Sequence, residues 1–571
     1  MAMEIQIECT HGLADRYCHV KRLAAYDLND DAQADVADLV FVLETSESSN
    51  RDRRDAVNRT VVLAKPDRAR LVELVEAQRE FRDVLLNDPY RPTYHFVNPE
   101  GRGMPFDPNG AIFWNSMYHL CYIYQNDDRI AEHAIGERNY DCWGHASSID
   151  LLHWRFHKTA LAPGDPDKSI FSGNCFINNK GEATMLYHAV GAGNCIATCS
   201  EPELENWTKL TSNPIVPIPE KGSLFSSWDP HGWTENGVHH AIFGGPTPAL
   251  FKAQDLDDWE YVGPFMSREL PDVDTEHEDV SCPDFFELGD RHALLCISHE
   301  RGARIYLGEW KNNQFHPEVH QRMNFPGGTC FAPESLLDDK GRRIMWAWVL
   351  DRNERLHITD FTNPPAYGWS GIMTLPRVLS LAGDGTLLIA PVEELERLRL
   401  RERRERNITV KDDRTVRLDG IEGNTLELAL TIDPGDADAL GLKVCASPDG
   451  KEQTLIEYNP SKGQLTVDLE KSSLDESIKH YSYTMFFRAG EENPIVTKQV
   501  APLELGPGEN LELRIFIDRS IIEIFANERQ CITQRIYPTR EDSTGIELFS
   551  KGSSMTVKSL QAWDMAPTNQ W

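Results

Sequence analysis

Short apolar or alternating runs, punctuated by turn residues, fill the chain from about residue 90 to about residue 385. Segments such as Asn179-Lys180-Gly181 and Asp339-Lys340-Gly341 separate the runs. This pattern predicts antiparallel strands joined by tight turns. An all-β chain of this size avoids open sheet edges by forming a propeller or a large barrel. The clearest predicted strands are residues 111–113, 185–189, 239–243, 292–297 and 344–349.

A second alternating region follows, from about residue 407 to about residue 565, and is clearest at residues 511–517 and 520–525. At this length a β-sandwich is the natural expectation. Residues 391–406 lie between the two regions. They are charged and compatible with a helix, and we interpret them as a linker.

The first part of the chain differs from both β regions. Apolar residues recur there at three- and four-residue spacing after Pro66, which suits a first helical turn, so a helix is predicted from Pro66 to about residue 86. Short strand-like runs at residues 38–43 and 60–64 precede it. We therefore expect an all-β protein with a small mixed N-terminal extension. The expected parts are the extension (1–88), a propeller (89–390), a linker (391–406) and a sandwich (407–571).

Charge and composition narrow the function. The 571 residues include 90 acidic and 58 basic ones, a formal net charge of -32, which repels nucleic acids and anionic membranes. No run of about 18 apolar residues suggests a membrane span, and residues 1–22 lack the apolar core of a secretory signal. The 12 cysteines lack paired metal spacing and predict reduced, packed thiols. A cytoplasmic location follows as an expectation, and nothing indicates an oligomeric state.

Candidate chemistry begins at Asp107-Pro108-Asn109-Gly110, which predicts a turn that holds one carboxylate at a bend facing a cavity. By itself this segment would be an ordinary turn. Further segments, however, place an acidic or polar residue beside Pro, Gly or Cys next to an apolar run. In chain order they are Trp228-Asp229-Pro230, Ser281-Cys282-Pro283-Asp284, Phe331-Ala332-Pro333-Glu334 and Gly368-Trp369-Ser370-Gly371.

These segments resemble glycoside hydrolase family 32, the invertase, levanase and inulinase family, over roughly residues 90 to 565. The resemblance implies a five-bladed β-propeller with a funnel-shaped pocket, a C-terminal β-sandwich, and a β-fructofuranosidase-like activity on fructosyl bonds. The segments that carry it are residues 91–96, 107–110, 118–120, 143–146, 150–154, 171–173, 228–230, 281–285, 368–371, 374–377, 516–520, 536–539 and 543–545.

Retaining glycoside hydrolysis needs an ionised carboxylate that attacks the anomeric carbon and an acid that protonates the leaving oxygen. By resemblance, Asp107 matches the nucleophile. Asp229 matches the aspartate that binds fructosyl hydroxyls and stabilises the transition state. The further residues expected to contact substrate are Asn109, Trp143, Ser172, Trp228, Ser281, Glu334 and Trp369.

The third carboxylate is missing from its usual place. Ser281 stands where the family has glutamate, and a hydroxyl holds its proton too tightly to act as a general acid. Glu278 is the first-choice substitute, because its long side chain, in the loop before a strand, can fold back over a propeller mouth. Asp279 and Glu334 are alternatives. The acid would need a raised pKa, from burial beside Asp107 or against aromatic walls.

Two aromatic residues also depart from the family pattern. Phe106 replaces the usual Asn and Trp228 the usual Arg, so two polar sugar contacts become flat apolar surfaces. A substrate other than plain sucrose in the ordinary pose is therefore expected. The candidate aromatic walls are Phe106, Trp114, Trp143, Trp228 and Trp233.

The leading hypothesis is a hydrolase that releases β-linked fructosyl units from sucrose or fructans by double displacement through Asp107. A fructosyltransferase or a related furanosidase would use the same site. If Ser281 means that the site has no general acid, the alternative is a propeller that binds a glycan without cleaving it. No cofactor and no metal are predicted, because His277, Glu278 and Cys282 lack the usual zinc spacing.

Overall fold

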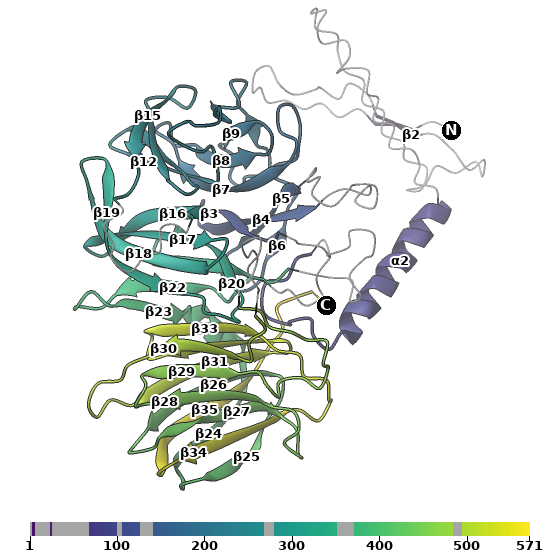
Figure 1. The fold of residues 1–571 in the computed structure, drawn as a ribbon. Helices are drawn as coiled ribbons and strands as arrows, with labels where there is room; N and C mark the ends of the chain where they lie inside the picture. Colours follow the sequence, from purple (N-terminus) through teal and green to yellow (C-terminus); the bar gives the residue numbers. More distant parts are fainter. Residues whose placement is uncertain are drawn as a thin grey trace, which may run out of the picture. The chain divides into compact units, whose positions relative to one another are not determined.

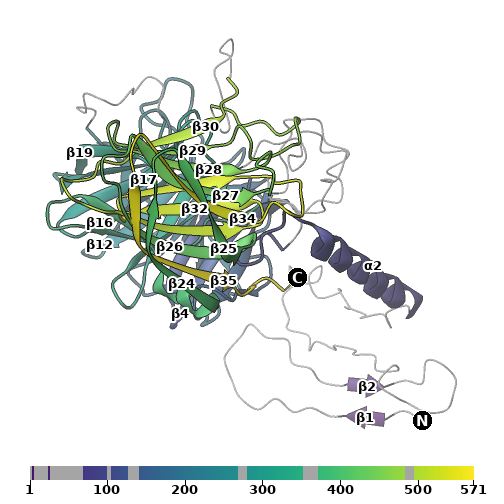
Figure 2. The same ribbon diagram turned by 90° about the horizontal axis from the view of Figure 1, so that it is seen from below.

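The computed structural model describes residues 3–5, 23–25, 68–99, 105–125, 141–267, 279–350, 371–482 and 494–570. The chain divides into two units, Met1–Leu86 and Asn87–Trp571. Helix α2 covers Arg68–Asn87 (Figure 1), and strands β1 (Met3–Ile5) and β2 (Leu23–Ala25) pair with each other (Figure 2). Helix α2 confirms the predicted helix, whereas the predicted strands at 38–43 and 60–64 lie outside the described residues. Within the described residues, no helix combines the length and the apolar character needed to cross a bilayer.

Five antiparallel sheets follow one another along the chain, each built from consecutive strands in order. This arrangement is that of a β-propeller. All five strands predicted between residues 111 and 349 are confirmed, as β3, β8, β13, β17 and β21. The sheets comprise β3 (Pro108–Trp114), β4 (Met117–Gln125), β5 (Asp141–Ser148) and β6 (Arg155–Phe156); β7 (Ile170–Ile177), β8 (Ala183–Ala189), β9 (Gly193–Cys199), β10 (Thr208–Lys209) and β11 (Val216–Pro217); β12 (Pro230–Glu235), β13 (Val238–Phe243), β14 (Ala249–Ala253) and β15 (Trp259–Pro264); β16 (Ser281–Leu288), β17 (Arg291–Ser298), β18 (Gly302–Lys311) and β19 (Gln314–Arg322); and β20 (Cys330–Leu337), β21 (Arg343–Val349), β22 (Arg377–Leu381) and β23 (Leu387–Pro391).

The first strands of the five sheets contact one another in succession. Strand β3 contacts β7, β7 contacts β12, β12 contacts β16, β16 contacts β20, and β20 contacts β3 again. Their starts are therefore brought together from all five sheets, although up to about 220 residues separate them along the chain. Polar side chains placed at these starts converge.

A β-bulge near the start of the first strand recurs in four of these sheets, in β3, β7, β16 and β20. The predicted turn at Asp107-Pro108-Asn109-Gly110 is wrong, because Asp107 directly precedes β3 and the next three residues belong to the strand. Pro108 is tolerated as a first strand residue. Gly110, at φ +58°, provides the left-handed conformation beside the bulge. The segments at residues 107–110, 281–284 and 331–334 thus mark bulged strand starts, where a bulge re-aims side chains.

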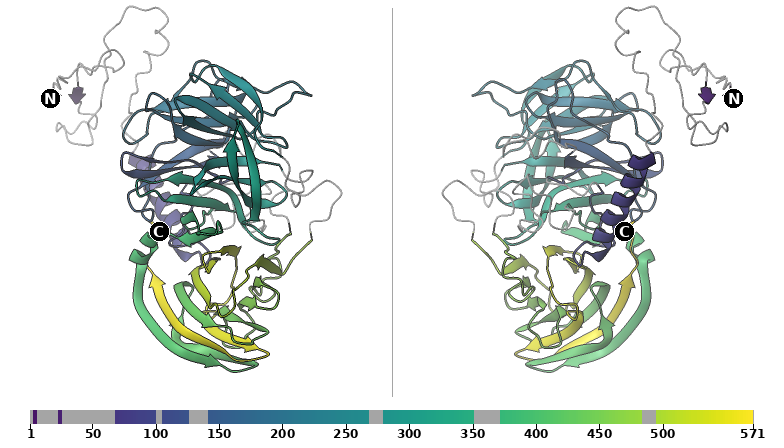
Figure 3. Two further views of the ribbon diagram at one scale, coloured as in Figure 1. Left: turned by 90° about the vertical axis from the view of Figure 1, so that its left-hand side faces the viewer. Right: turned by 90° about the vertical axis from the view of Figure 1, so that its right-hand side faces the viewer.

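Two six-stranded sheets enclose a second apolar core and form the predicted β-sandwich. Figure 2 shows β24, β35 and β26 side by side, and Figure 3 shows the sandwich as two facing layers. Strands β31 and β32 confirm the two strands predicted there. One sheet orders β24 (Arg399–Val410), β35 (Met555–Met565), β26 (Thr425–Asp433), β31 (Leu511–Asp518), β32 (Ile521–Ala526) and β33 (Gln530–Arg535); the other orders β25 (Arg414–Glu422), β34 (Gly545–Lys551), β27 (Ala439–Ala446), β28 (Thr454–Asn459), β29 (Gln464–Asp468) and β30 (Lys498–Pro502).

The predicted linker differs from the structure. The 3₁₀ helix η4 covers Glu393–Leu398, and the following residues form β24 at the edge of a sandwich sheet. Strand β24 pairs along its length with β35, but most of its side chains are exposed. An edge strand with few buried side chains shows little alternation, so its sequence is compatible with a helix. The predicted domain boundaries stay predictions.

Candidate active site

The starts of the five first strands border one cavity of about 220 Å³. Four residues singled out in the sequence, Asp107, Ser172, Trp228 and Asp229, face it together. The cavity therefore combines two carboxylates with aromatic and aliphatic walls. Its lining consists of Pro105, Asp107, Ile123, Phe171, Ser172, Trp228, Asp229, Cys282, Ile297, His299 and Phe331.

Asp107 is held from both its side chain and its main chain. The hydroxyl of Ser172 donates to Asp107 Oδ2 at 2.8 Å, and Cys282 Sγ lies 3.8 Å from the same oxygen. Asn109 Nδ2 donates to the main-chain oxygen of Asp107 at 2.8 Å, while Asn109 Oδ1 accepts from the Gly173 N–H at 3.0 Å. Asn109 thus fixes the backbone around Asp107 to β7, and it is not among the residues that line the cavity.

Asp229 is 4 % exposed and accepts a hydrogen bond at Oδ2 from the main-chain N–H of Cys282, at 3.1 Å. Burial raises the pKa of Asp229, and the nearby His188 and His299 and the Cys282 N–H oppose this effect. Cys282 sits in the bulge of β16 with φ +45°, and its Sγ lies 3.6 Å from Asp229 Oδ2. Burial, reinforced by the charges of Asp107 and Asp229, raises the pKa of this thiol well above its ordinary value. Cys282 is therefore a neutral group between two carboxylates.

Ser281 is fully buried and does not line the cavity. Its Oγ accepts from Trp228 Nε1 at 2.9 Å and donates to Asp279 Oδ2 at 2.8 Å. Asp279 Oδ2 also lies 2.6 Å from His299 Nδ1, and Asp279 Oδ1 accepts from the His299 main-chain N–H at 2.9 Å. Ser281 is thus one member of a hydrogen-bonded group that ends at His299, in the cavity wall.

The Asp279–His299 contact is an ion pair when His299 is protonated. Burial alone would raise the pKa of Asp279, but the hydrogen bonds and charge of His299 outweigh it and lower that pKa to about 2. For His299 burial acts in the opposite direction and lowers the pKa. The hydrogen bond to Asp279 and the charges of Asp279, Asp229 and Asp107 outweigh burial, so the pKa of His299 is raised. The sequence singled out Asp279 but not His299. The signal available was strand parity, since the turn at Gly289-Asp290 pairs Ser281 with Ile297, two residues before His299.

Other residues singled out in the sequence lie behind the cavity. Trp143 is fully buried, and its Nε1 donates to the main-chain oxygen of Phe171 at 3.0 Å. Glu334, on β20, accepts at Oε1 from the Ala111 N–H at 3.1 Å. Neither residue is part of the described lining. Glu278 and Trp369 lie outside the described residues, so their roles stay predictions.

Of the predicted aromatic walls, only Trp228 is part of the described lining. The expectation that Phe106 forms a flat surface for sugar is wrong, because Phe106 is fully buried and stacks on Phe96 with ring centroids 6.2 Å apart. Neighbouring residues of an extended chain point to opposite sides, so Phe106 packs into the core while Asp107 faces the cavity.

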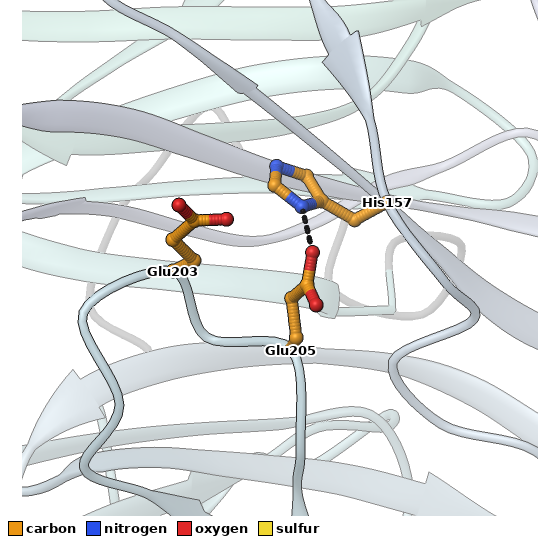
Figure 4. Close-up of side chains that lie close together, drawn as sticks. All are labelled: His157, Glu203 and Glu205. Atoms are coloured by element: carbon orange, nitrogen blue, oxygen red, sulfur yellow. Dashed lines mark hydrogen bonds and ion pairs between the residues drawn. The ribbon is translucent and has the colours of Figure 1, made fainter. Parts of the chain in front are cut away.

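Among the described residues, His157, Glu203 and Glu205 have ligand types and mutual distances suited to a metal ion (Figure 4). His157 Nδ1 lies 2.9 Å from Glu205 Oε1. Arg155 Nη1 donates to Glu203 Oε2 at 3.0 Å, and Lys158 lies 3.9 Å from Glu205. These side chains already balance both carboxylates, and none of them lines the cavity. We therefore assign this group a structural role outside the cavity.

Two buried aspartates border one cavity at the starts of propeller strands, and they supply carboxylates of the kind that glycosidases use. The model for the glycosyl hydrolases family 32 N-terminal domain matches residues 95–391, and the model for the family 32 C terminal matches residues 394–564. The chain belongs to glycosyl hydrolases family 32.

Similar proteins span nearly the whole of this chain. A sucrose-6-phosphate hydrolase of Zymomonas mobilis is 27 % identical over 552 residues, covering 89 % of this chain and 98 % of the relative. A levanase of Bacillus subtilis is 28 % identical over 517 residues, covering 83 % and 70 %. The crystal structure of fructan 1-exohydrolase IIa from Cichorium intybus superposes with a TM-score of 0.71 at 25 % identity, covering 84 % of this chain and 98 % of that one.

Proposed function

We propose that this glycosidase releases β-linked fructosyl units from sucrose or fructans by a retaining double displacement through Asp107. The observation that carries the proposal is the joint placement of Asp107 and Asp229 in one cavity. The relatives named for sucrose 6-phosphate, levan and fructan support a fructosyl substrate. The cavity of about 220 Å³ is smaller than a typical drug-sized pocket, which suits a single terminal sugar unit.

Asp107 attacks the anomeric carbon in this scheme and forms a covalent fructosyl ester, which water then hydrolyses. The Ser172 hydroxyl, 2.8 Å from Asp107 Oδ2, orients the attacking carboxylate. Asp229 accepts hydrogen bonds from fructosyl hydroxyls and stabilises the positive charge that develops on the sugar ring. Trp228 offers its indole face to the sugar.

The lining also bears on the substrate's charge. Among the residues that the structure describes, the cavity wall contains no Lys or Arg, and His299 is its one basic residue. Phosphate binding in proteins relies mainly on Arg, Lys or clustered backbone N–H groups. We therefore place uncharged sucrose and fructans ahead of a sugar phosphate as substrates.

The fold that we propose for this site is a five-bladed propeller, each of the five sheets forming one blade. The ring of contacts among the five first strands supports this interpretation. In such a ring every first strand lies next to the central axis, so a residue at each strand start can reach a shared cavity. The first strand of every sheet, or the residue just before it, does contribute to the lining.

Covalent trapping tests the proposal. The protein is incubated with a fluorinated fructosyl analogue that carries an activated leaving group, and its peptides are then analysed by mass spectrometry. We expect the label on the peptide that contains Asp107. Asp107→Ala should lose fructose release from sucrose, levan and inulin, whereas Asp290→Ala, at an exposed turn, should retain it. Label on another peptide, or none despite turnover, would refute Asp107 as nucleophile, and fructosylated sugars in place of free fructose would identify a transferase.

A further inference from the structure

We propose that His299, positioned by Asp279, is the general acid and base of this site. The proposal rests on the proposed function, since it needs a glycosidic oxygen to protonate. It starts from a juxtaposition: a His–Asp pair lies in the wall of the cavity that also holds Asp107, beside the Ser281 that occupies the usual place of the acid.

The hairpin of β16 and β17 brings these residues together. Ser281 pairs with Ile297 across the hairpin, and His299 follows two residues later. Residues two apart on an extended chain share a face, and both Ile297 and His299 line the cavity. The acid function has thus moved from the first strand of the hairpin to the residue that directly follows the second strand.

The ring of His299 is fixed at one nitrogen. Nδ1 lies 2.6 Å from Asp279 Oδ2 and 3.3 Å from Ser281 Oγ, so we assign the proton transfer to the other ring nitrogen, Nε2. The indole of Trp228 and the ring of Phe331 flank the imidazole, with centroids 6.2 and 6.5 Å away. The His299 side chain retains 25 % exposure, so it is partly accessible between these aromatic walls. A carboxylate that orients an imidazole in this way also stabilises its protonated form.

The groups that face His299 come from three elements. Asp279 precedes β16, Asp107 precedes β3 and Asp229 precedes β12, and the charges of all three raise the pKa of His299 against the opposing effect of burial. The neutral thiol of Cys282 lies between Asp107 and Asp229. These charges favour the imidazolium, which is the form of His299 that has a proton to give.

Two other candidate acids, Asp279 and Glu334, fit less well. Asp279 has a pKa of about 2 and is ionised. Glu334 has a raised pKa because of its burial and the nearby Asp284, but it is absent from the described lining and bonds to the Ala111 N–H instead. Glu278 lies outside the described residues, so the test below compares Glu278→Gln directly with His299→Gln.

The chemistry balances in two steps. In the first, Nε2–H of the imidazolium gives its proton to the glycosidic oxygen as the bond from that oxygen to the anomeric carbon breaks; Asp107 bonds to the carbon and the alcohol leaves. In the second, the neutral imidazole removes a proton from water as the water oxygen attacks the anomeric carbon. The ester bond then breaks, which regenerates the Asp107 carboxylate and the imidazolium.

The test uses two substrates that differ in their leaving groups. Sucrose needs protonation of its leaving oxygen, whereas a nitrophenyl β-fructofuranoside does not. We expect His299→Gln to reduce kcat/KM for sucrose roughly 10²- to 10⁴-fold and to affect the nitrophenyl substrate far less. Azide needs no general base, so it should accelerate the turnover of the nitrophenyl substrate by His299→Gln. The product should be a fructosyl azide of retained configuration. His153→Gln is the matched control, because His153 also pairs with an aspartate, Asp150, at 2.9 Å but has an exposed side chain.

The pH profile separates a proton donor from a structural residue. The basic limb of kcat/KM should disappear in His299→Gln. In Asp279→Asn it should move to lower pH, because the imidazolium loses its main stabilising charge. Equal losses on both substrates with an unchanged basic limb would overturn the proposal, as would a leaving-group-dependent loss in Glu278→Gln in place of His299→Gln. Absence of fructose release by the unmodified protein from either substrate would instead overturn the proposed function itself.

Discussion

The two walls of the cavity differ in how they keep the chemistry of the family. One wall holds Asp107 and Asp229, both at positions that the family resemblance predicts, with Ser172 bonded to Asp107. At the other wall Ser281 occupies the usual position of the acid but is buried behind the lining, and the Asp279–His299 pair that contacts it brings His299 into the cavity. A nucleophile must bond to one particular carbon, so its position tolerates little change. A proton donor needs only reach and a suitable pKa, so a neighbouring strand can supply it.

Of four further substitutions that compare the two walls, Asp229→Asn should have the largest effect. The substitution keeps the size of the side chain but removes the charge that stabilises the transition state. We expect kcat for sucrose to fall roughly 10²- to 10³-fold. The fluorinated probe should still label the Asp107 peptide, only more slowly. An unchanged kcat, with Asp290→Asn as the surface control, would show that the first wall does not depend on Asp229.

Ser172→Ala tests how far the first wall depends on orientation. The variant loses the 2.8 Å hydrogen bond to Asp107 Oδ2, and hydrogen bonds to charged groups contribute about 1.5 to 3 kcal/mol. We expect kcat/KM to fall roughly 10- to 100-fold on both the sucrose and the nitrophenyl substrate, because nucleophilic attack is common to both. A loss confined to sucrose would contradict this role and connect Ser172 with the proton donor.

Glu334→Gln tests the support behind the first wall. Burial and the nearby Asp284 raise the pKa of Glu334 well above 4.5, so the folded state binds a proton that the unfolded state releases as pH rises above that value. The contribution of Glu334 therefore lowers the unfolding free energy of the wild type as pH rises. The glutamine variant does not titrate, so it does not lose this free energy. We expect the variant to gain about 1 to 3 kcal/mol of unfolding free energy at pH 8 and no comparable gain at pH 4. Denaturant unfolding at both pH values measures it; an equal difference at both would contradict the raised pKa.

Trp228→Phe should have the smallest effect. Phenylalanine keeps an aromatic face for the sugar but loses the 2.9 Å hydrogen bond from Nε1 to Ser281 Oγ, worth about 0.5 to 1.5 kcal/mol. We expect KM for sucrose to rise roughly 2- to 10-fold and the basic limb of the pH profile to stay in place. A larger loss with a shifted basic limb would show that Trp228 holds the Ser281–Asp279–His299 group together.

Prediction from the sequence succeeded where the signal is local. Alternating runs and turn glycines predicted the propeller and sandwich strands, and spaced apolar residues predicted α2. It failed at Asp107-Pro108-Asn109-Gly110 and at β24. A bulged strand start and a tight turn use the same residues, Pro, Asn and Gly, because both need a backbone that departs from regular extension. Only the pairing of β3 with β4 distinguishes them.

The sequence by itself identified Asp107 and Asp229 as candidate site residues and showed that Ser281 replaces the usual acid. It also gave the order along the chain of the strands that carry these residues. The tertiary structure decided which groups share the cavity, since the register of β16 and β17 brings Asp279 and His299 together across 20 residues of chain. It also raised the pKa of His299, which depends on burial and on carboxylates from three separate elements. Local patterns record turns and alternation within one strand, whereas burial and the electrostatic field exist only once distant strands have packed.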